Sequence, residues 1–298
     1  MENINQVSII GAGTMGNGIA HVFAQNGFNV ILIDINENCL KNGLENIKKN
    51  IDRQILKKQL KHSDKSSILS RIVTNNNLKD GVTSSRLVIE AATEDYNIKK
   101  KIFEEIDNYA PKNAILATNT SSISITKLAA TTERPAQVIG MHFMNPVPIM
   151  KLVEVIKGFA TSKSTVSTII KTVTDLEKIA IEVKDYPGFT ANRILLPMIN
   201  EAIFSLFEGV AGVSEIDTVM KLGMAHPMGP LQLADFIGLD VCLSVLRVLQ
   251  EGIGDDKYRP CPLLVNMVSA GRLGKKSGEG FYKYDQNSKD FSVSKQFE

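Results

Sequence analysis

The sequence predicts an α/β protein in which a mostly parallel sheet is followed by an all-α C-terminal domain. Three observations support this fold class: strand-like and helix-like segments alternate in the first half, a glycine-rich segment joins the first strand to the first helix, and strand-like runs become few after Pro187-Gly188. We therefore predict two domains, residues 1–186 and 187–298, and a chain of 298 residues is long enough for both.

Short apolar runs mark the strands of the first domain, at residues 5–10, 28–34, 87–91, 115–118, 138–142, 152–156 and 179–183. A first helix is predicted from about Met15 to Asn26. A long second helix follows, because its apolar residues are spaced as one helix face (Leu40, Leu44, Ile47, Ile51 and Ile55). A third helix ends at Pro111, and the polar residues from about Gln286 onward are expected to form a loose tail.

The glycine-rich segment is the strongest motif. Gly11-Ala12-Gly13-Thr14-Met15-Gly16 follows a strand and opens a helix, as in a Rossmann-type dinucleotide site. The first glycine would permit a tight turn, the second a close approach of the backbone to a pyrophosphate, and the third close packing of helix and strand. Amide groups at the helix N-terminus would attract the phosphates. The alternative is a glycine turn that serves packing only.

Asp34 ends the second strand, 18 residues after Gly16, where a carboxylate can bind a ribose hydroxyl. No Arg or Lys directly follows it, so NAD is predicted rather than NADP.

The four histidines differ in their surroundings. His21 falls inside the first helix and is expected to pack against the sheet, and His226 lies in a proline-rich turn. His142 ends an apolar strand, and catalytic groups of open α/β sheets gather at the carboxyl ends of strands. Position alone leaves it open whether His142 is catalytic or a structural histidine.

Glu154 interrupts the apolar run from Leu152 to Ile156. A carboxylate among aliphatic neighbours is costly unless it is paired. A partner histidine would satisfy it, and the carboxylate would in turn fix the tautomer of the imidazole. The alternative is an edge strand with Glu154 in water.

Other polar residues allow two interpretations. Ser121 follows a strand, and Asn192 and Arg193 open a helix, so each could serve as a cap. A helix predicted from Lys48 to Lys61 carries six basic residues against Asp52, and His62 is placed in the same lysine-rich helix. That basic face could be solvated, or it could hold the phosphates of a large anionic ligand or, less favourably, nucleic acid.

Composition excludes several classes of protein. A net charge of +2 argues against a dedicated nucleic-acid binder. Cys39, Cys242 and Cys261 lie far apart, so neither a metal site nor a disulfide framework is predicted, and a cytoplasmic protein is expected. Residues 3–33 lack charged side chains but contain too many Asn and Gly for a membrane helix, and Glu2 argues against a signal peptide.

Taken together, the motifs resemble those of the L-3-hydroxyacyl-CoA dehydrogenase family over nearly the whole chain. The segments that carry this resemblance are 9–16, 88–94, 119–122, 142–148, 187–193, 228–230, 238–240 and 275–282. The single-module length is similar to that of the bacterial short-chain 3-hydroxybutyryl-CoA dehydrogenases. This resemblance implies oxidation of an (S)-3-hydroxyacyl-CoA, most simply 3-hydroxybutanoyl-CoA, to the 3-oxoacyl-CoA with NAD, and a homodimer.

The resemblance also implies roles for individual residues. His142 matches the family's catalytic base and Glu154 the acid that orients it, while Ser121 and Asn192 match the residues that hold the reacting oxygens. Cofactor contacts are implied for the glycine-loop residues and for a further set: Asp34, Glu94, Lys99, Ser121, Asn145 and Lys276. Lys57 matches a contact to the CoA portion.

Two positions depart from the family pattern. Asn50 stands where relatives often have a CoA-contacting Ser. His226 replaces an aromatic or apolar residue and is not expected in catalysis. Pro187-Gly188 would allow the second domain to close over the thioester.

Two other functions are compatible with parts of the sequence. One is a related two-domain dehydrogenase of a free hydroxy acid. The other is a non-catalytic NAD-binding protein, which would have no reason to keep His142, Glu154, Ser121 and Asn192 together.

Overall fold

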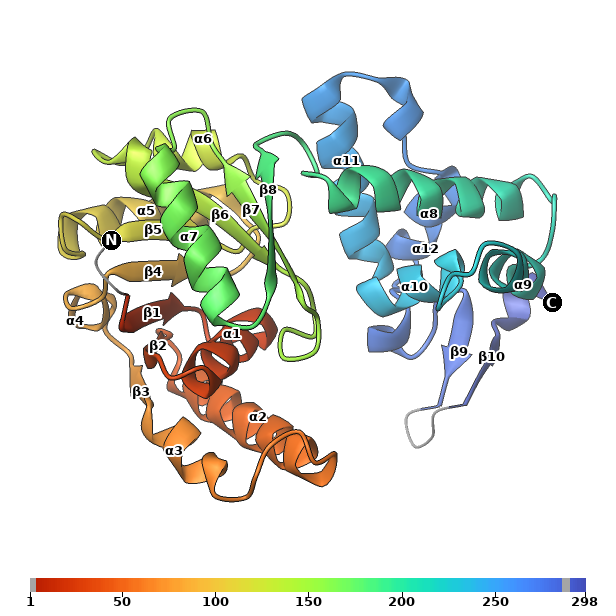
Figure 1. The fold of residues 1–298 in the computed structure, drawn as a ribbon. Coiled ribbons are helices and arrows are strands. Elements are labelled where there is room, and N and C mark those ends of the chain that lie inside the picture. The colour runs from red at the N-terminus through yellow and green to blue at the C-terminus, as the bar shows by residue number, and fades with distance from the viewer. Residues whose placement is uncertain (1–3, 286–289) are drawn as a thin grey trace. The chain divides into compact units, whose positions relative to one another are not determined.

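The computed structural model describes residues 4–285 and 290–298, and its backbone contacts divide the chain between Tyr186 and Pro187 into two units (Figure 1). The first unit contains an eight-stranded sheet with its helices, and the second is mostly helical. Each unit has its own apolar core. Within the described residues, no helix is long and apolar enough to cross a membrane.

The first unit alternates strands and helices, as its apolar pattern predicts. Its strands are β1 (Gln6–Ile10), β2 (Asn29–Ile33), β3 (Ile72–Asn75), β4 (Leu87–Glu90), β5 (Ile115–Thr118), β6 (Val138–Phe143), β7 (Leu152–Lys157) and β8 (Ile179–Lys184). Its helices are α1 (Thr14–Gln25), α2 (Glu37–Leu56), α3 (Asp64–Ser70), α4 (Leu78–Val82), α5 (Tyr96–Tyr109), α6 (Ile125–Ala129) and α7 (Lys163–Asp175). A short 3-10 turn, η1 (Pro135–Gln137), precedes β6.

The strand order in the sheet is β3-β2-β1-β4-β5-β6-β7-β8. Every neighbouring pair is parallel except β6 and β7, which are antiparallel. Parallel strands need helical crossovers, whereas β6 and β7 are joined by the short loop 144–151, which contains a cis peptide at Asn145-Pro146. The chain thus reverses direction immediately after β6.

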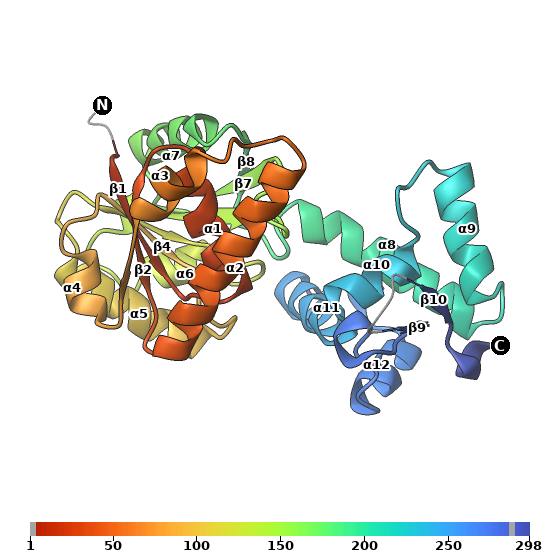
Figure 2. The same ribbon diagram turned by 90° about the horizontal axis from the view of Figure 1, so that it is seen from below.

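Helices cover both faces of the sheet, and Figure 2 shows α1 and α7 on the face opposite α4 and α5. The first face forms the main apolar core, in which Ile9, Ile89 and Met141 pack with Phe23 of α1 and Ile169 of α7. Because side chains alternate along a strand, the even-numbered residues near the ends of β4, β5 and β6 point to the other face. That face carries the polar residues of the candidate site.

The second unit consists of five helices among its described residues: α8 (Ala191–Phe207), α9 (Val213–Gly223), α10 (Pro230–Ile237), α11 (Leu239–Ile253) and α12 (Pro262–Ser269). Three 3-10 turns accompany them: η2 (Asp256–Tyr258), η3 (Lys275–Ser277) and η4 (Lys295–Phe297). A small antiparallel pair, β9 (Tyr282–Tyr284) and β10 (Phe291–Val293), is added to this helical unit. Each of these strands has three residues, too few to show a period in the sequence.

Two predictions of local structure are wrong. The helix predicted from Lys48 to Lys61 ends at Leu56, because Lys57 is its C-cap and Lys58 has a left-handed backbone, so His62 lies in an exposed turn rather than in a helix. The C-terminal residues 290–298 are not a loose tail, since they form β10 and η4 and bury Ser294. The predicted tail residues 286–289 lie outside the described residues.

Candidate active site

The glycine-rich segment forms the connection between β1 and α1. Gly11 has φ +97°, which side chains other than glycine rarely adopt, and a β-carbon there would lie 2.6 Å from the carbonyl oxygen of Ala91. A β-carbon on Gly16 would overlap the carbonyl oxygen of Gly11. Both glycines are therefore required by the fold of this turn.

Gly13 is different, because a β-carbon at this position would meet no atom within 4 Å. It is also the N-cap of α1, where no side chain caps the helix and no acidic residue lies in the first turn. The amide groups at this helix end can therefore donate hydrogen bonds to a bound anion. The local structure fits the pyrophosphate of a dinucleotide, which would approach over Gly13 and the first residues of α1, Thr14 and Met15.

Asp34 follows β2 and binds the glycine-rich turn through the amide of Ala12. One of its carboxylate oxygens accepts a hydrogen bond of 2.9 Å from the amide of Ala12, and the other accepts one of 2.9 Å from Asn36. The carboxylate is half-buried and fixed beside the turn, which is where a ribose hydroxyl could reach it.

His142 and Glu154 are directly opposite each other in the antiparallel β6–β7 pair. His142 Nδ1 lies 2.8 Å from Glu154 Oε2, and the two residues are only 8% and 2% exposed. The carboxylate is buried in an interior strand, so the alternative of an edge strand with Glu154 in water does not hold. The contact to Nδ1 leaves Nε2 as the ring nitrogen directed to other partners.

The loop after β5 lies beside His142. The side-chain oxygen of Asn119 accepts a hydrogen bond of 2.9 Å from the amide of Phe143, which is the residue after His142. Glu90 pairs with Thr118 in the β4–β5 register, and Thr118 pairs with Gly140 in β6. The carboxyl ends of β4, β5 and β6 therefore gather polar side chains at one edge of the sheet.

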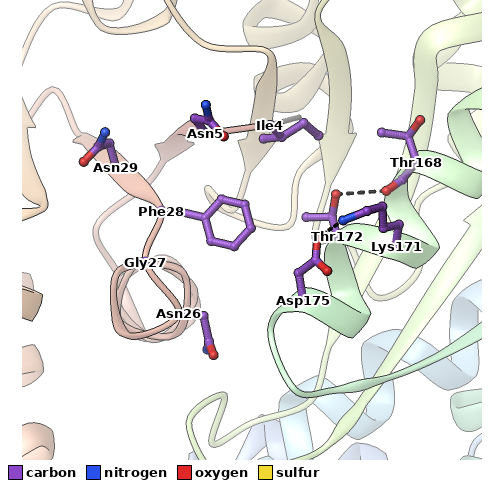
Figure 3. Close-up of a pocket in the computed structure, with 10 residues that line it drawn as sticks. All are labelled: Ile4, Asn5, Asn26, Gly27, Phe28, Asn29, Thr168, Lys171, Thr172 and Asp175. Atoms are coloured by element: carbon purple, nitrogen blue, oxygen red, sulfur yellow. Dashed lines mark hydrogen bonds and ion pairs between the residues drawn. The ribbon is translucent and has the colours of Figure 1, made fainter. Parts of the chain in front are cut away.

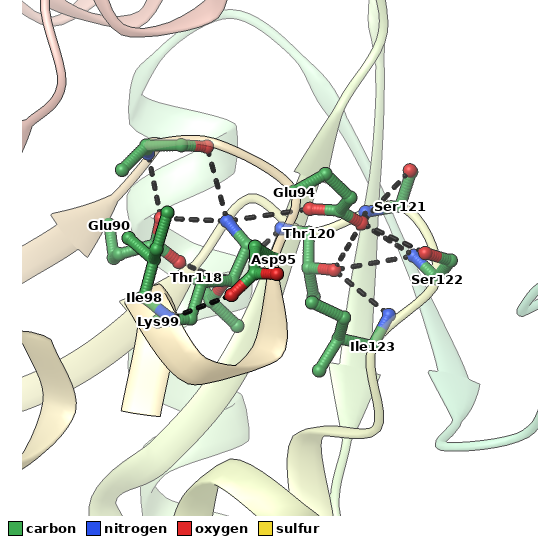
Figure 4. Close-up of polar contacts among 11 residues, drawn as sticks. Glu90, Glu94, Asp95, Ile98, Lys99, Thr118, Thr120, Ser121, Ser122 and Ile123 are labelled. Atoms are coloured by element: carbon green, nitrogen blue, oxygen red, sulfur yellow. Dashed lines mark hydrogen bonds and ion pairs between the residues drawn. The ribbon is translucent and has the colours of Figure 1, made fainter. Parts of the chain in front are cut away.

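Glu94 binds the turn that carries Ser121 (Figure 4). Its Oε1 accepts hydrogen bonds from the amides of Ser121 and Ser122 at 2.8 and 3.1 Å and from the hydroxyls of Thr120, Ser121 and Ser122 at 2.6, 3.1 and 3.0 Å. Partial burial of Glu94 raises its pKa, but the Lys99 ammonium and these donors outweigh burial and keep the pKa below its ordinary value. Glu94 is thus an anion that orders the Ser121 turn.

Lys99 is almost entirely buried, at 1% exposed. Its ammonium lies 2.7 Å from Glu90 Oε1, 3.3 Å from the Ala92 carbonyl oxygen and 3.4 Å from Glu94 Oε2. Lys99 is predicted as a cofactor contact. In the structure its ammonium group binds Glu90, Ala92 and Glu94.

A cavity of about 250 Å³ lies between α1, α2 and the loop after β6. It brings together three residues that the sequence predicted for the cofactor or CoA, namely Thr14, Asn50 and Asn145. It is also lined by Asn17, Gly18, Asn46, Lys49, Arg53, Pro146, Val147 and Pro148. The lining is rich in amides and carries two cations, which suits a polar anionic ligand.

Two lysines bear on this region in different ways. Lys57, predicted to contact CoA, lies exposed at the C-cap of α2 and does not line the cavity. Lys178 is buried and donates hydrogen bonds of 2.7 and 2.6 Å to the carbonyl oxygens of Val147 and Met150, so it fastens the loop that carries Asn145.

The remaining predicted site residues belong to the second unit. Asn192 lies in the first turn of α8, and Arg193 donates its amide to the carbonyl oxygen of Gly188. The ammonium of Lys276, in η3, lies 2.5 Å from the carboxylate of Asp240.

A second cavity, of about 510 Å³, contains none of the predicted site residues (Figure 3). It lies before the amino ends of β1 and β2, where Asn5, Phe28 and Asn29 face Lys171 and Asp175 of α7. The site residues of the first unit gather instead at the carboxyl ends of the strands.

Glu90, Thr118 and Asn119 have no role predicted from the sequence. The signal for Glu90 was present, since it ends the apolar run Leu87–Glu90 in the same way that Glu154 interrupts its own strand. Thr118 and Asn119 could not be identified from the sequence, because only the folded sheet places Thr118 beside Glu90 and Asn119 beside the end of β6.

Comparison with known proteins agrees with this arrangement. Residues 6–186 match the family model of the 3-hydroxyacyl-CoA dehydrogenase NAD binding domain, and residues 188–284 match that of the 3-hydroxyacyl-CoA dehydrogenase C-terminal domain. The two models meet at the point where the chain divides into its two units.

Individual relatives cover almost the whole chain. A 3-hydroxybutyryl-CoA dehydrogenase of Bradyrhizobium diazoefficiens is 54% identical over 94% of this chain and 96% of its own length. A probable 3-hydroxybutyryl-CoA dehydrogenase of Bacillus subtilis is 51% identical over 96% of this chain and 99% of its own length. The crystal structure of (S)-3-hydroxybutyryl-CoA dehydrogenase from Ralstonia eutropha is 50% identical and superposes with a TM-score of 0.92 over 95% of this chain and 100% of that one. With a dinucleotide-binding first unit and relatives of this similarity, the chain is an NAD-dependent oxidoreductase and belongs to the 3-hydroxyacyl-CoA dehydrogenase family.

Proposed function

We propose that this protein interconverts (S)-3-hydroxybutanoyl-CoA and acetoacetyl-CoA. The observation that carries the proposal is the 2.8 Å contact between His142 and Glu154, at the carboxyl end of β6 and beside the Ser121 turn. A histidine oriented by a buried carboxylate is suited to move one proton to or from an alcohol. The names of the relatives supply the substrate.

His142 acts as the general base in the direction of oxidation. With Nδ1 held by Glu154, Nε2 takes the proton of the 3-hydroxyl, and in the direction of reduction the same nitrogen returns it. The charge of Glu154 stabilises the imidazolium that forms. Such proton transfer contributes about 10²–10⁴-fold to the rate.

When bound, NAD⁺ would accept the hydride from C3 of the hydroxyacyl substrate, and NADH would supply it in the direction of reduction. The glycine-rich turn and the N-terminus of α1 would hold the cofactor, and Asp34 would bind its adenosine ribose. We assign further contacts to Glu94, Ser121 and Asn145 in the first unit and to Lys276 in the second. Lys99 contributes indirectly, through its contact with Glu94.

The oxygen at C3 develops negative charge during reduction, and hydrogen-bond donors lower the energy of that charge. We assign this role to Ser121 and Asn192. Ser121 is held by Glu94. Asn192 is assigned by the family resemblance alone.

We place the CoA portion along α2, with contacts to Asn50 and Lys57. The cations Lys49 and Arg53 line the same cavity as Asn50 and favour the phosphates. On this assignment residues 1–186 are the NAD-binding domain, and residues 187–298 serve the substrate and dimerisation.

A homodimer is proposed for the second domain, as the family resemblance implies. Several large apolar side chains on α8 and α9 and beside them are exposed, namely Ile194, Phe207, Val210, Val219, Leu222 and Met224. A partner that covered them would remove this apolar surface from water. We place the protein in the cytoplasm on the sequence argument from its scattered cysteines.

The test is to mix the purified protein with acetoacetyl-CoA and to follow nicotinamide absorbance with NADH and then with NADPH. We expect rapid oxidation of NADH and little of NADPH. A preference for NADPH would keep the chemistry and contradict the role of Asp34.

The same assay separates the alternatives. Oxidation of NADH with free acetoacetate but not with its CoA thioester would favour a dehydrogenase of a free hydroxy acid. A folded protein that binds NADH and oxidises it with neither substrate would instead be a non-catalytic NAD-binding protein.

A further inference from the structure

We infer that Glu90 is a positioning residue of the reaction, which acts through Lys99 on Glu94 and so on the turn that carries Ser121. The inference rests on the proposed function of Ser121 and Glu94. The Glu90 carboxylate binds Ala92, Lys99 and Thr118, and its effect on the Ser121 turn is transmitted through the buried charge of Lys99.

Glu90 itself is fully buried at the end of β4. One carboxylate oxygen accepts hydrogen bonds of 2.7 Å from the amide of Ala92 and from the Lys99 ammonium, and the other accepts one of 2.7 Å from the Thr118 hydroxyl. Three donors around one buried carboxylate fix its position.

The Lys99 ammonium lies between two carboxylates (Figure 4). It is closer to Glu90, at 2.7 Å, than to Glu94, at 3.4 Å. Because Glu90 takes the shorter contact, the charge of Glu94 is only partly compensated by Lys99. Glu94 keeps its other oxygen for the five donors of the Ser121 turn.

The three groups together carry one net negative charge, which resides at Glu94. Removing the charge of Glu90 would leave a buried ammonium with Glu94 as its nearest remaining carboxylate. We expect Lys99 then to approach Glu94 and to draw it away from the turn. Ser121 would lose its orientation although it is unchanged itself.

The variant Glu90→Gln tests this chain of contacts, because it removes the charge and keeps the shape. We expect kcat/KM for acetoacetyl-CoA to fall about 10–100-fold, the range for a misplaced catalytic group, and the Kd for NADH to rise. The double variant Glu90→Gln/Lys99→Met restores the single negative charge at Glu94 and should regain part of the lost activity.

A matched control is the buried ion pair of Asp107 and Arg134, with a 2.6 Å contact in the same domain. Its other hydrogen bonds, among the described residues, go to Glu133 and Pro111 and not to site residues. Asp107→Asn also breaks a buried pair, but it should lower stability without changing kcat/KM or the NADH affinity of the folded protein. Glu90→Asp keeps the charge and serves as the milder variant if Glu90→Gln does not fold. It should show a smaller loss of the same kind.

Wild-type kinetics and NADH affinity in folded Glu90→Gln would overturn the inference, and so would a double variant no more active than Glu90→Gln. Equal impairment in Asp107→Asn would show a general effect of lost stability. If the wild type itself does not reduce acetoacetyl-CoA, the proposed function fails. The role of Glu90 is then decided by the NADH affinity of the variants alone.

Discussion

Gly16 packs so closely on Gly11 that a single β-carbon on Gly16 would overlap the Gly11 carbonyl oxygen. Gly13, between them in the sequence, faces open space. The three glycines of one motif therefore serve different purposes: Gly11 and Gly16 allow the turn to form, and Gly13 leaves room for a ligand.

Alanine substitutions should separate these purposes. Gly13→Ala displaces no atom but puts a poorer residue at the N-cap of α1, so it should cost no more than about 1 kcal/mol of stability. It should raise the Kd for NADH by about 10-fold or more. Gly16→Ala should destabilise the protein by about 3 kcal/mol through overpacking. Thermal unfolding and NADH fluorescence titration measure both effects, and equal stability loss in the two variants would contradict the assignment.

The proton transfer assigned to His142 predicts a loss of turnover without a loss of binding. His142→Ala should lower kcat by about 10²–10⁴-fold and leave the Kd for NADH unchanged. Glu154→Gln keeps the shape of the buried side chain but not its charge, so a loss of about 10²-fold is expected. Normal turnover in His142→Ala would exclude this histidine as the acid–base group.

The basic residues at the end of α2 predict recognition of CoA phosphates. Arg53→Ala and Lys57→Ala should each raise KM for acetoacetyl-CoA about 5–10-fold, most strongly at low salt, and leave kcat unchanged. A short thioester without the nucleotide should show no change in either variant. Lys41→Ala, nearer the N-terminus of the same helix, is the control, and an equal effect there would indicate a general charge effect.

The pH dependence of stability should contain a contribution from His21. This residue is fully buried, beside the side chains of Gln54 and Gln25. Burial lowers the pKa of His21 to about 4, a shift that the neighbouring Gln54 and Gln25 reduce. The unfolded chain, with a pKa near 6.5, therefore binds more protons than the folded one between pH 6.5 and 4, and stability falls as the pH is lowered.

The loss should reach roughly 3 kcal/mol at pH 4, and it should be absent in His21→Leu. Asp235 acts in the opposite direction, since burial raises its pKa to about 6, but this contribution is common to both proteins and cancels in the comparison. Denaturant unfolding at pH 7 and pH 4 measures the difference. Identical pH dependence in wild type and His21→Leu would show that His21 is protonated without cost.

Much of the site could be predicted because its residues break a pattern. Glu154 is a carboxylate in an apolar strand, and the structure pairs it with a histidine. The glycine-rich segment lies between β1 and α1, as its sequence context indicates. In both cases the cost of a buried charge or of a missing side chain is visible in the sequence alone.

The rest depends on contacts that spacing does not show. Helix α2 ends where Lys58 adopts a left-handed backbone. Glycine is the usual sequence signal for this conformation, and it is absent at this position. Strand β3 was missed because it is a short edge strand with partly exposed residues. The network of Glu90, Lys99 and Glu94 requires β4 and α5 to be folded before its charges meet.

The antiparallel pairing of β6 and β7 has a consequence for how the acid–base pair forms. His142 and Glu154 are 12 residues apart in the chain, whereas Ser121 and Glu94 are 27 apart. A short loop costs little closure entropy, so a hairpin can bring its two strands into register without waiting for distant parts of the chain. Both members of the pair thus belong to one local segment of the chain. Changes elsewhere in the molecule can alter the surroundings of the pair without separating His142 from Glu154.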